Sequence, residues 1–250
     1  MVKPRRRTRD NRKFYMTLGG IAVIGAAMVA YAATRPDAPA ATTVDPNVPA
    51  GLVEGYVMGS PTAPVEIVEY ADFECPACAQ FAIVTEPQVR QLLIQTGKAR
   101  VRFFDYPIKE IHPNTLSAHL AAACANDQGK FWEMHDRLFQ LQDRWNAAAA
   151  RNPKGVFTGF ARELGLDANA WEDCYDDKRH AARIQASYAA AQMRQIRSTP
   201  TFIVGKTMYP GAIGYDALKA LVDSAAAAAP AKAPAATPPA PTDSGRPKRP

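Results

Sequence analysis

The sequence predicts an α/β domain in which a helical segment is inserted between two parts of one sheet. Three observations indicate this. Strand-like runs at residues 65–70 and 100–104 are separated by one helical stretch, a long block of helical patterns follows, and two further strand-like runs at 201–204 and 207–209 precede a last helix. Strands that alternate with helices are typical of a sheet covered by helices.

The first part of the domain is expected to be a strand, a helix and a second strand. In residues 65–70, VEIVEY, β-branched residues alternate with polar ones, which favours a strand. A helix is expected over residues 76–95, ended by Gly97. The run RVRFF at 100–104 predicts the second strand, and Pro107 stops it because proline has no amide hydrogen for a strand ladder.

The helical insertion is expected over about residues 112–197. Apolar residues recur there at spacings of three and four, as in Phe131, Met134 and Leu138, and this periodicity favours amphipathic helices. The two later strand-like runs are joined by a Gly-Lys turn, and a last helix is expected from about residue 215 to 226.

The composition is that of an ordinary folded protein, and the N-terminus is unusually basic. Hydrophobic residues make up 47% and charged residues 22%, which excludes wholesale disorder, collagen-like repetition and a multi-span membrane protein. The net charge is +6, and residues 1–13 alone supply it with seven Lys/Arg and one acid. The remaining residues balance at 23 basic and 23 acidic, so the composition does not support a nucleic-acid-binding face.

An apolar segment at residues 14–33 follows this basic leader. Its twenty residues carry no charge, and as a helix they would span about 30 Å, the thickness of a bilayer core. The basic residues before it predict that the leader, residues 1–13, stays cytoplasmic. Two interpretations remain open: an uncleaved single-pass anchor, or a cleaved signal peptide with its site at the small-x-small pattern of residues 30–32. Both predict an extracytoplasmic domain, in the periplasm, on the outer face of the membrane, or secreted.

One folded domain is expected between two segments without apolar periodicity. Residues 34–50 are rich in Pro, Ala and Thr and are interpreted as a linker. Residues 229–250 form an Ala/Pro-rich tail that is expected to be disordered, because it cannot bury enough apolar area to offset its ordering entropy. The domain therefore covers about residues 51–228.

A C-x-x-C motif, CPAC at residues 75–78, lies where the first strand passes into the helix. In this setting the motif predicts a redox dithiol. Cys75 would stand at the helix N-terminus, where free N–H groups and the helix dipole favour a thiolate. Cys78 follows on the same helical face, so the two sulfurs can bond. We therefore expect Cys75 to attack and Cys78 to resolve the mixed disulfide.

Three other uses of the C-x-x-C motif are less consistent with the sequence. A four-cysteine zinc site is disfavoured because Cys124 and Cys174 are isolated in amphipathic helices. Haem attachment would need a histidine after the second cysteine, where Ala79 stands. A purely structural disulfide is disfavoured because two cysteines at a helix start form a tight, reactive ring. We expect no metal and no organic cofactor.

A second signal is the segment STPTF at residues 198–202, which places a proline at the entrance of a strand. Together with the C-x-x-C motif and the order of the elements, it makes the chain resemble the DsbA-like branch of the thioredoxin superfamily, over about residues 51–226. Three segments carry the resemblance to membrane-tethered or secreted oxidoreductases of this branch: GSPTAPV at 59–65, DFECPAC at 72–78 and QGKFWEMH at 128–135.

The resemblance implies a thioredoxin-like fold with a helical insertion, and it implies roles for particular residues. Cys75 would attack and Cys78 would resolve. Thr199 and Pro200 would form a cis-proline loop that faces Cys75 and docks the extended chain of a partner. Glu69 is the candidate acid beneath the motif that moves protons from Cys78, with an ordinary surface glutamate as the alternative.

Two further expectations concern the insertion. An even number of cysteines in an oxidising compartment favours pairing, and related proteins carry such a pair, so a structural disulfide between Cys124 and Cys174 is expected, with two buried free thiols as the alternative. His112 follows the second strand and could approach the active face, or it could be a helix-start or core histidine.

The resulting functional hypothesis is an extracytoplasmic oxidase that donates the Cys75–Cys78 disulfide to reduced or unfolded exported proteins and is reoxidised by a membrane redox partner. A reductase or isomerase is the first alternative, because the inner dipeptide is Pro-Ala, whereas the histidine of the strongest DsbA oxidants stabilises the reduced form. The second is a non-catalytic, tethered, chaperone-like module whose groove around Pro200 holds unfolded chains.

Overall fold

The computed structural model describes residues 16, 20–26, 42–43 and 54–228. Residues 16 and 20–26 are helical and belong to a separate unit of the chain, residues 1–40. In the described part of the chain, no helix is long and apolar enough to cross a membrane. The predictions for the basic leader and the tail, and for most of the apolar segment and the linker, lie outside the described residues.

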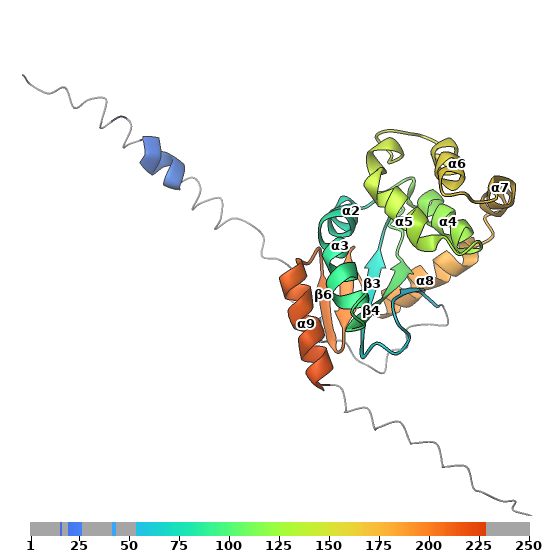
Figure 1. Cartoon of the computed structure of the whole chain (residues 1–250). Coiled ribbons are helices and arrows are strands. Elements are labelled where there is room, and N and C mark those ends of the chain that lie inside the picture. Colours follow the sequence, from blue (N-terminus) through green and yellow to red (C-terminus); the bar gives the residue numbers. More distant parts are fainter. Residues whose placement is uncertain (1–15, 17–19, 27–41, 44–53, 229–250) are drawn as a thin grey trace, which may run out of the picture. The chain divides into compact units, whose positions relative to one another are not determined.

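The described strands form one mixed sheet of six strands in the order β1-β6-β5-β3-β4-β2 (Figure 1). The neighbours β3 and β4 are parallel, and all other neighbouring strands are antiparallel. The strands are β1 (Thr42–Thr43), β2 (Tyr56–Met58), β3 (Val65–Ala71), β4 (Ala99–Asp105), β5 (Thr201–Val204) and β6 (Thr207–Pro210).

The helix expected over 76–95 is a continuous helical run in which α-helical turns alternate with wider π turns. The run comprises α2 (Pro76–Gln80), η1 (Phe81–Thr85), α3 (Glu86–Val89) and η2 (Arg90–Ile94). The insertion comprises α4 (Thr115–Asn126), α5 (Phe131–Gln140), η3 (Gln142–Arg144), α6 (Lys154–Glu163), α7 (Ala168–Asp176) and α8 (Ala181–Met193). The last helix is α9 (Tyr215–Ala228). The predicted α/β fold with a helical insertion is therefore confirmed.

The strand β3 buries side chains on both faces of the sheet. Alternate side chains of a strand point in opposite directions, so β3 contacts a different set of helices on each face. Ile67 packs in a cluster with Phe81 of the first helical run and Leu218 of α9. Tyr70 belongs to a second cluster with Ala191 of α8. The sheet thus has α2, α3 and α9 on one face and α8 on the other, and the helices α4 to α7 gather near the carboxyl end of β3 (Figure 1).

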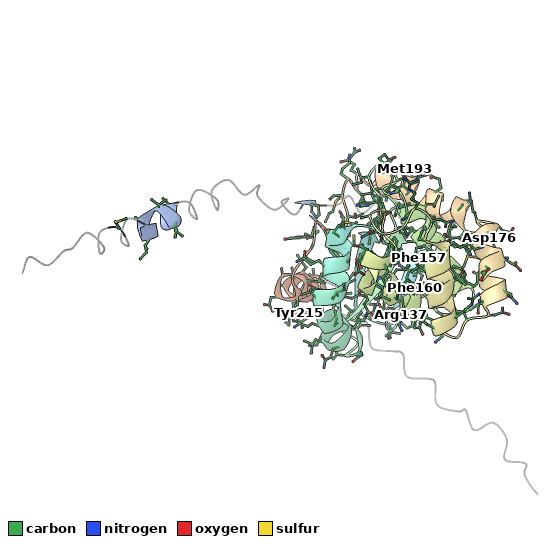
Figure 2. The ribbon with its side chains drawn as sticks, turned by 90° about the horizontal axis from the view of Figure 1, so that it is seen from above. Arg137, Phe157, Phe160, Asp176, Met193 and Tyr215 are labelled. Atoms are coloured by element: carbon green, nitrogen blue, oxygen red, sulfur yellow. A yellow bond between two sulfur atoms is a disulfide. The ribbon has the colours of Figure 1, made fainter. Side chains whose placement is uncertain are left out.

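The insertion has its own buried aromatic core. Phe157 and Phe160 of α6 are buried, and the ring of Phe157 lies 5.3 Å from that of Trp145 (Figure 2). The structure contains the Cys124–Cys174 disulfide, which joins α4 to α7 with an S–S distance of 2.03 Å. These contacts make the insertion one packed unit.

The strands β1 and β2 were not predicted. With two and three residues, they are too short to show the alternation of apolar and polar residues that identifies a strand in a sequence. Gly55 directly precedes β2. A Cβ atom on this residue would lie 2.5 Å from the carbonyl oxygen of Phe103, so the close approach of β2 to β4 requires a glycine at this position.

Replacing both Cys124 and Cys174 with alanine should lower the free energy of unfolding by about 4 kcal/mol, because the bridge closes a loop of 50 residues in the unfolded chain. Urea denaturation would measure this in a background that also carries Cys75→Ser and Cys78→Ser, with that background alone as the control. A loss below about 1 kcal/mol would contradict the expectation.

Candidate active site

The turn between β3 and α2 sets the position of the motif. The N–H of Cys75 donates to the backbone oxygen of Asp72 at 3.1 Å, and the N–H of Glu74 donates to the Asp72 carboxylate at 2.8 Å. Cys75 is the N-cap residue of α2 with an extended backbone, and Pro76 occupies the first helical turn. The free N–H groups at the start of the helix therefore lie beside the Cys75 sulfur.

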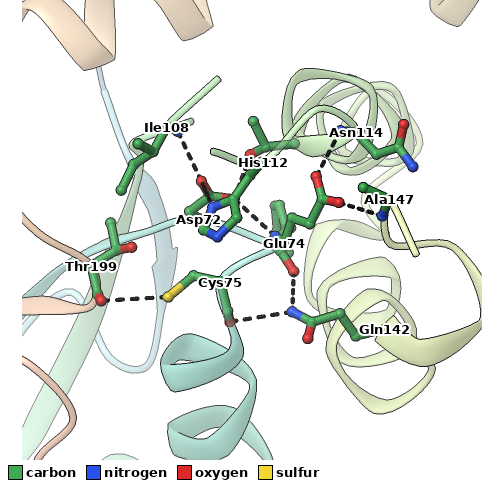
Figure 3. A network of polar contacts seen from close by, with 11 residues as sticks. Asp72, Glu74, Cys75, Ile108, His112, Asn114, Gln142, Ala147 and Thr199 are labelled. Carbon is green, nitrogen blue, oxygen red and sulfur yellow. Dashed lines mark hydrogen bonds and ion pairs between the residues drawn. The ribbon is translucent and has the colours of Figure 1, made fainter. Parts of the chain in front are cut away.

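Cys75 is a buried thiol whose environment favours its anion. The protonated thiol donates to the carbonyl oxygen of Thr199 at 3.5 Å, and only 8% of the residue is exposed (Figure 3). A hydrogen bond from the Cys78 thiol, aided by the Thr199 side chain and by the backbone N–H groups of Cys78 and Ala77, lowers the pKa of Cys75 to about 6, although burial opposes this shift.

Cys78 has the opposite environment. It is completely buried, and burial together with the neighbouring Cys75 raises the pKa of its thiol well above the ordinary value. Both cysteines are free thiols in this structure, so the pair is in its reduced form. The negative charge of the reduced pair therefore lies on Cys75, and Cys78 keeps its proton.

The loop at Thr199 and Pro200 lies against Cys75 because of the register of the sheet. Thr201 of β5 stands opposite Tyr70 of β3, so the residues before β5 lie at the carboxyl end of β3, where the motif begins. The Thr199–Pro200 peptide bond is cis. The N–H of Gly211 donates to the carbonyl oxygen of Pro200 at 2.7 Å and holds the loop in place.

Glu69 is inside the domain. It is 2% exposed and stands between Phe103 of β4 and Phe202 of β5, so the alternative of a surface glutamate is wrong. Burial, with the nearby carboxylate of Glu86, raises the pKa of Glu69 well above its ordinary value. The charge of Glu69 is also one of the causes that raise the pKa of Cys78, after burial and the neighbouring Cys75.

A partly buried group of three charged residues, Glu86, Arg90 and Asp136, was not predicted. The guanidinium of Arg90 donates to Glu86 at 3.0 Å and to Asp136 of α5 at 2.9 Å. The spacing of Glu86 and Arg90 by four residues was a visible signal for a helical pair. The contact with Asp136, which joins the first helical run to the insertion, had no signal in the sequence.

Asp72 is a second residue of the site that was not predicted from the sequence. Its buried carboxylate accepts hydrogen bonds from the N–H of Ile108 at 2.8 Å, from Nδ1 of His112 at 2.8 Å and from the hydroxyl of Thr115. These donors, of which His112 is the strongest, lower the pKa of Asp72 despite its burial. His112 lies in the loop three residues before Thr115, the first residue of α4, and its hydrogen bond to Asp72 holds it at the active-site turn.

Two further side chains join the insertion to the motif, that of Gln142 from the insertion and that of Glu74 from the active-site turn (Figure 3). Gln142 donates to the carbonyl oxygens of Phe73 at 2.8 Å and Cys75 at 3.2 Å. The buried carboxylate of Glu74 accepts from the backbone N–H groups of Asn114 and Ala147, both at 2.6 Å. The insertion therefore holds the backbone that carries Cys75.

One group of side chains in the described part of the chain has the spacing of metal ligands: Cys124, Cys174 and His180. Its two sulfur atoms are bonded to each other, so they are not thiolate ligands in this structure.

The sheet with its parallel neighbours β3 and β4, the dithiol at a helix start and the cis-proline loop beside it define a protein of thioredoxin fold with a redox-type cysteine pair. Residues 52–224 match the family described as Thioredoxin, and the chain belongs to that family. The DsbA α-DsbA1 of Wolbachia pipientis superposes with a TM-score of 0.63 at 22% identity, over 74% of this chain and 94% of that one, which shows the shared fold.

Two curated relatives were also found. The Na(+)/H(+) antiporter NhaA 3 of Salinispora tropica is 38% identical over 186 residues, which cover 74% of this chain and 27% of the antiporter. The chain thus spans about a quarter of the length of that relative. The probable disulfide bond formation protein D of Bacillus anthracis is 24% identical over 178 residues, 66% of this chain and 76% of that protein.

Alkylation of the reduced protein by iodoacetamide should follow the ionisation of Cys75. Since only the thiolate reacts and its pKa is about 6, the rate should be near its maximum at pH 7 and about tenfold slower at pH 5. Mass spectrometry would locate the label, with Cys75→Ser as the control that remains unlabelled at Cys78. A midpoint near 8.5, or earlier labelling of Cys78, would contradict the assignment.

Proposed function

We propose that this protein is a thiol–disulfide oxidoreductase that exchanges its Cys75–Cys78 disulfide with cysteine-containing proteins. The observation that carries the proposal is the unequal pair: Cys75 has its pKa lowered to about 6 beside the Thr199 loop, and Cys78 is buried with its pKa raised. Such a pair supplies one good leaving thiolate and one protected resolving thiol. The name of the Bacillus anthracis relative supports the same chemistry.

The exchange proceeds in two steps. A substrate thiolate attacks the Cys75 sulfur of the disulfide form, a substrate–Cys75 bond forms, and Cys78 leaves and takes a proton. A second substrate thiolate then attacks the substrate sulfur of this mixed disulfide and releases Cys75 as a thiolate. The substrate loses two electrons and becomes a disulfide, and the cysteine pair gains them. Thr199 and Pro200 would hold the substrate in an extended conformation beside Cys75.

Glu69 serves as the proton acceptor and donor for Cys78. A completely buried thiol has no water to exchange its proton with, so a nearby titratable group must carry it. Burial keeps Glu69 protonated at a higher pH than an exposed carboxyl, so it can deliver a proton when Cys78 leaves as a thiolate.

We place the protein outside the cytoplasm as an oxidase of exported proteins. The basic leader followed by an apolar segment at residues 14–33 supports export, either as a tethered or as a secreted protein. A membrane redox partner would take two electrons from the reduced pair, and the one proton held by Cys78 would be released. The reductase or isomerase alternative is favoured by one observation, the inner Ala77 in place of a histidine.

Two assays distinguish these functions. The oxidised protein should accelerate disulfide formation in a reduced, unfolded ribonuclease, and Cys75→Ser should abolish this activity. The variant Cys124→Ala/Cys174→Ala, which keeps the motif, is the matched control and should stay active. Faster reduction of insulin than oxidation of ribonuclease under one glutathione buffer would favour the reductase. No turnover in either assay would contradict the proposal.

Replacing Glu69 with glutamine should slow the release of Cys78 from the Cys75–Cys78 disulfide under attack by a substrate thiolate by about 100-fold, because the amide cannot donate or accept the proton. Stopped-flow measurement of the reaction with a reduced peptide would show this, while alkylation of Cys75 should change little. Glu66→Gln, on the same strand with its side chain paired to Arg100 and Arg102, is the control. Equal rates for Glu69→Gln and wild type would remove the proton-transfer role.

A further inference from the structure

We propose that His112, as an imidazolium ion, supplies the positive charge beside the Cys75 thiolate that the inner residues of the motif lack, and so makes the Cys75–Cys78 disulfide a stronger oxidant. The inner residues are Pro76 and Ala77, neither of which carries a charge. The inference rests on the proposed function, and it assigns the control of redox strength to a side chain 37 positions after Cys75 in the chain.

The geometry depends on Asp72. One oxygen of its carboxylate accepts from Nδ1 of His112 at 2.8 Å, and the other accepts from the N–H of Glu74 at 2.8 Å. The backbone oxygen of Asp72 accepts from the N–H of Cys75 at 3.1 Å. His112 and Cys75 are thus held by the same residue, and the ring lies above the turn that carries Cys75 (Figure 3).

The groups that face His112 all favour its charged form. The hydrogen bond to Asp72 raises the pKa of His112, and the negative charges of Asp72, Cys75 and Glu74 raise it further, while partial burial opposes the shift. The side chain of His112 is 14% exposed, so solvent screens these charges only in part. On its own loop, the charged residues Lys109 and Glu110 are exposed.

The coupling between His112 and Cys75 acts in both directions. If the Cys75 thiolate strengthens proton binding at His112, then the imidazolium strengthens ionisation of Cys75 by the same factor, because a coupling free energy between two sites is reciprocal. Separately from this proposed coupling, the hydrogen bonds from Cys78 and from the backbone at the start of α2 lower the pKa of Cys75.

The redox consequence follows from charge. The reduced pair carries a thiolate and the disulfide carries no charge, so a neighbouring cation stabilises only the reduced form. The protein disulfide and two glutathione thiols are in equilibrium with the protein dithiol and glutathione disulfide. His112 shifts this equilibrium towards the protein dithiol. The oxidant is the protein disulfide and the reductant is glutathione.

The test compares two substitutions at one position. His112→Asn keeps a donor for Asp72 without the charge, and His112→Ala removes both. Each should lower the equilibrium constant with glutathione three- to tenfold, which corresponds to a potential about 15 to 30 mV more negative. Each should also raise the pKa of Cys75 in a thiolate absorbance titration.

The matched control is His180→Asn. His180 is also partly exposed and paired with an aspartate, Asp127, at 2.9 Å, but it lies beside the Cys124–Cys174 disulfide. This variant should leave the potential and the Cys75 titration at the wild-type values. A change as large as that of His112→Asn would overturn the inference.

Two other results would overturn it. One is an equilibrium constant with glutathione that is unchanged in His112→Asn. If only His112→Ala changed this constant, His112 would act by positioning Asp72 and not by its charge. The other requires no substitution: NMR titration of wild type should show His112 binding its proton three- to tenfold more tightly in the reduced than in the oxidised protein, and equal binding contradicts the proposal. Failure of wild type to exchange with glutathione at all would instead overturn the proposed function.

Discussion

The active-site turn depends on one buried carboxylate, that of Asp72. It accepts hydrogen bonds from groups that lie far apart in the chain: the N–H groups of Glu74 and Ile108, the ring of His112 and the hydroxyl of Thr115. An ionised carboxylate in the interior is tolerated only when such donors replace its water, and here they fix the end of β4, the start of α4 and the turn before α2 relative to one another. The first cysteine of the motif receives its position from this arrangement.

The chemistry of the pair follows from where the helix begins. The start of α2 provides N–H groups to Cys75 alone, and the same helix places Cys78 one turn deeper, inside the core. The sheet then adds Glu69 beneath the pair and the Thr199 loop beside it, because β3 pairs with β5. One strand register therefore places both Glu69, the proposed proton carrier, and the loop proposed to dock the substrate.

Much of this site could be predicted from the sequence. The C-x-x-C motif and the proline at the entrance of β5 are recognisable by spacing and local pattern, whereas the sequence left open whether Glu69 is buried or on the surface. The contacts of Asp72 with His112 and of Arg90 with Asp136 could not be predicted, because they join residues 40 and 46 positions apart and depend on how the insertion packs. The strands β1 and β2 were too short to have a periodic pattern.

The reduction potential of the Cys75–Cys78 pair, measured by equilibration with glutathione, tests the central claim most directly. A Cys75 pKa of about 6 lies between those of about 7 in thioredoxin and about 3.5 in DsbA, so the potential should lie between about −270 and −120 mV. A value at or below about −270 mV would contradict the claim that this site stabilises a Cys75 thiolate for oxidation.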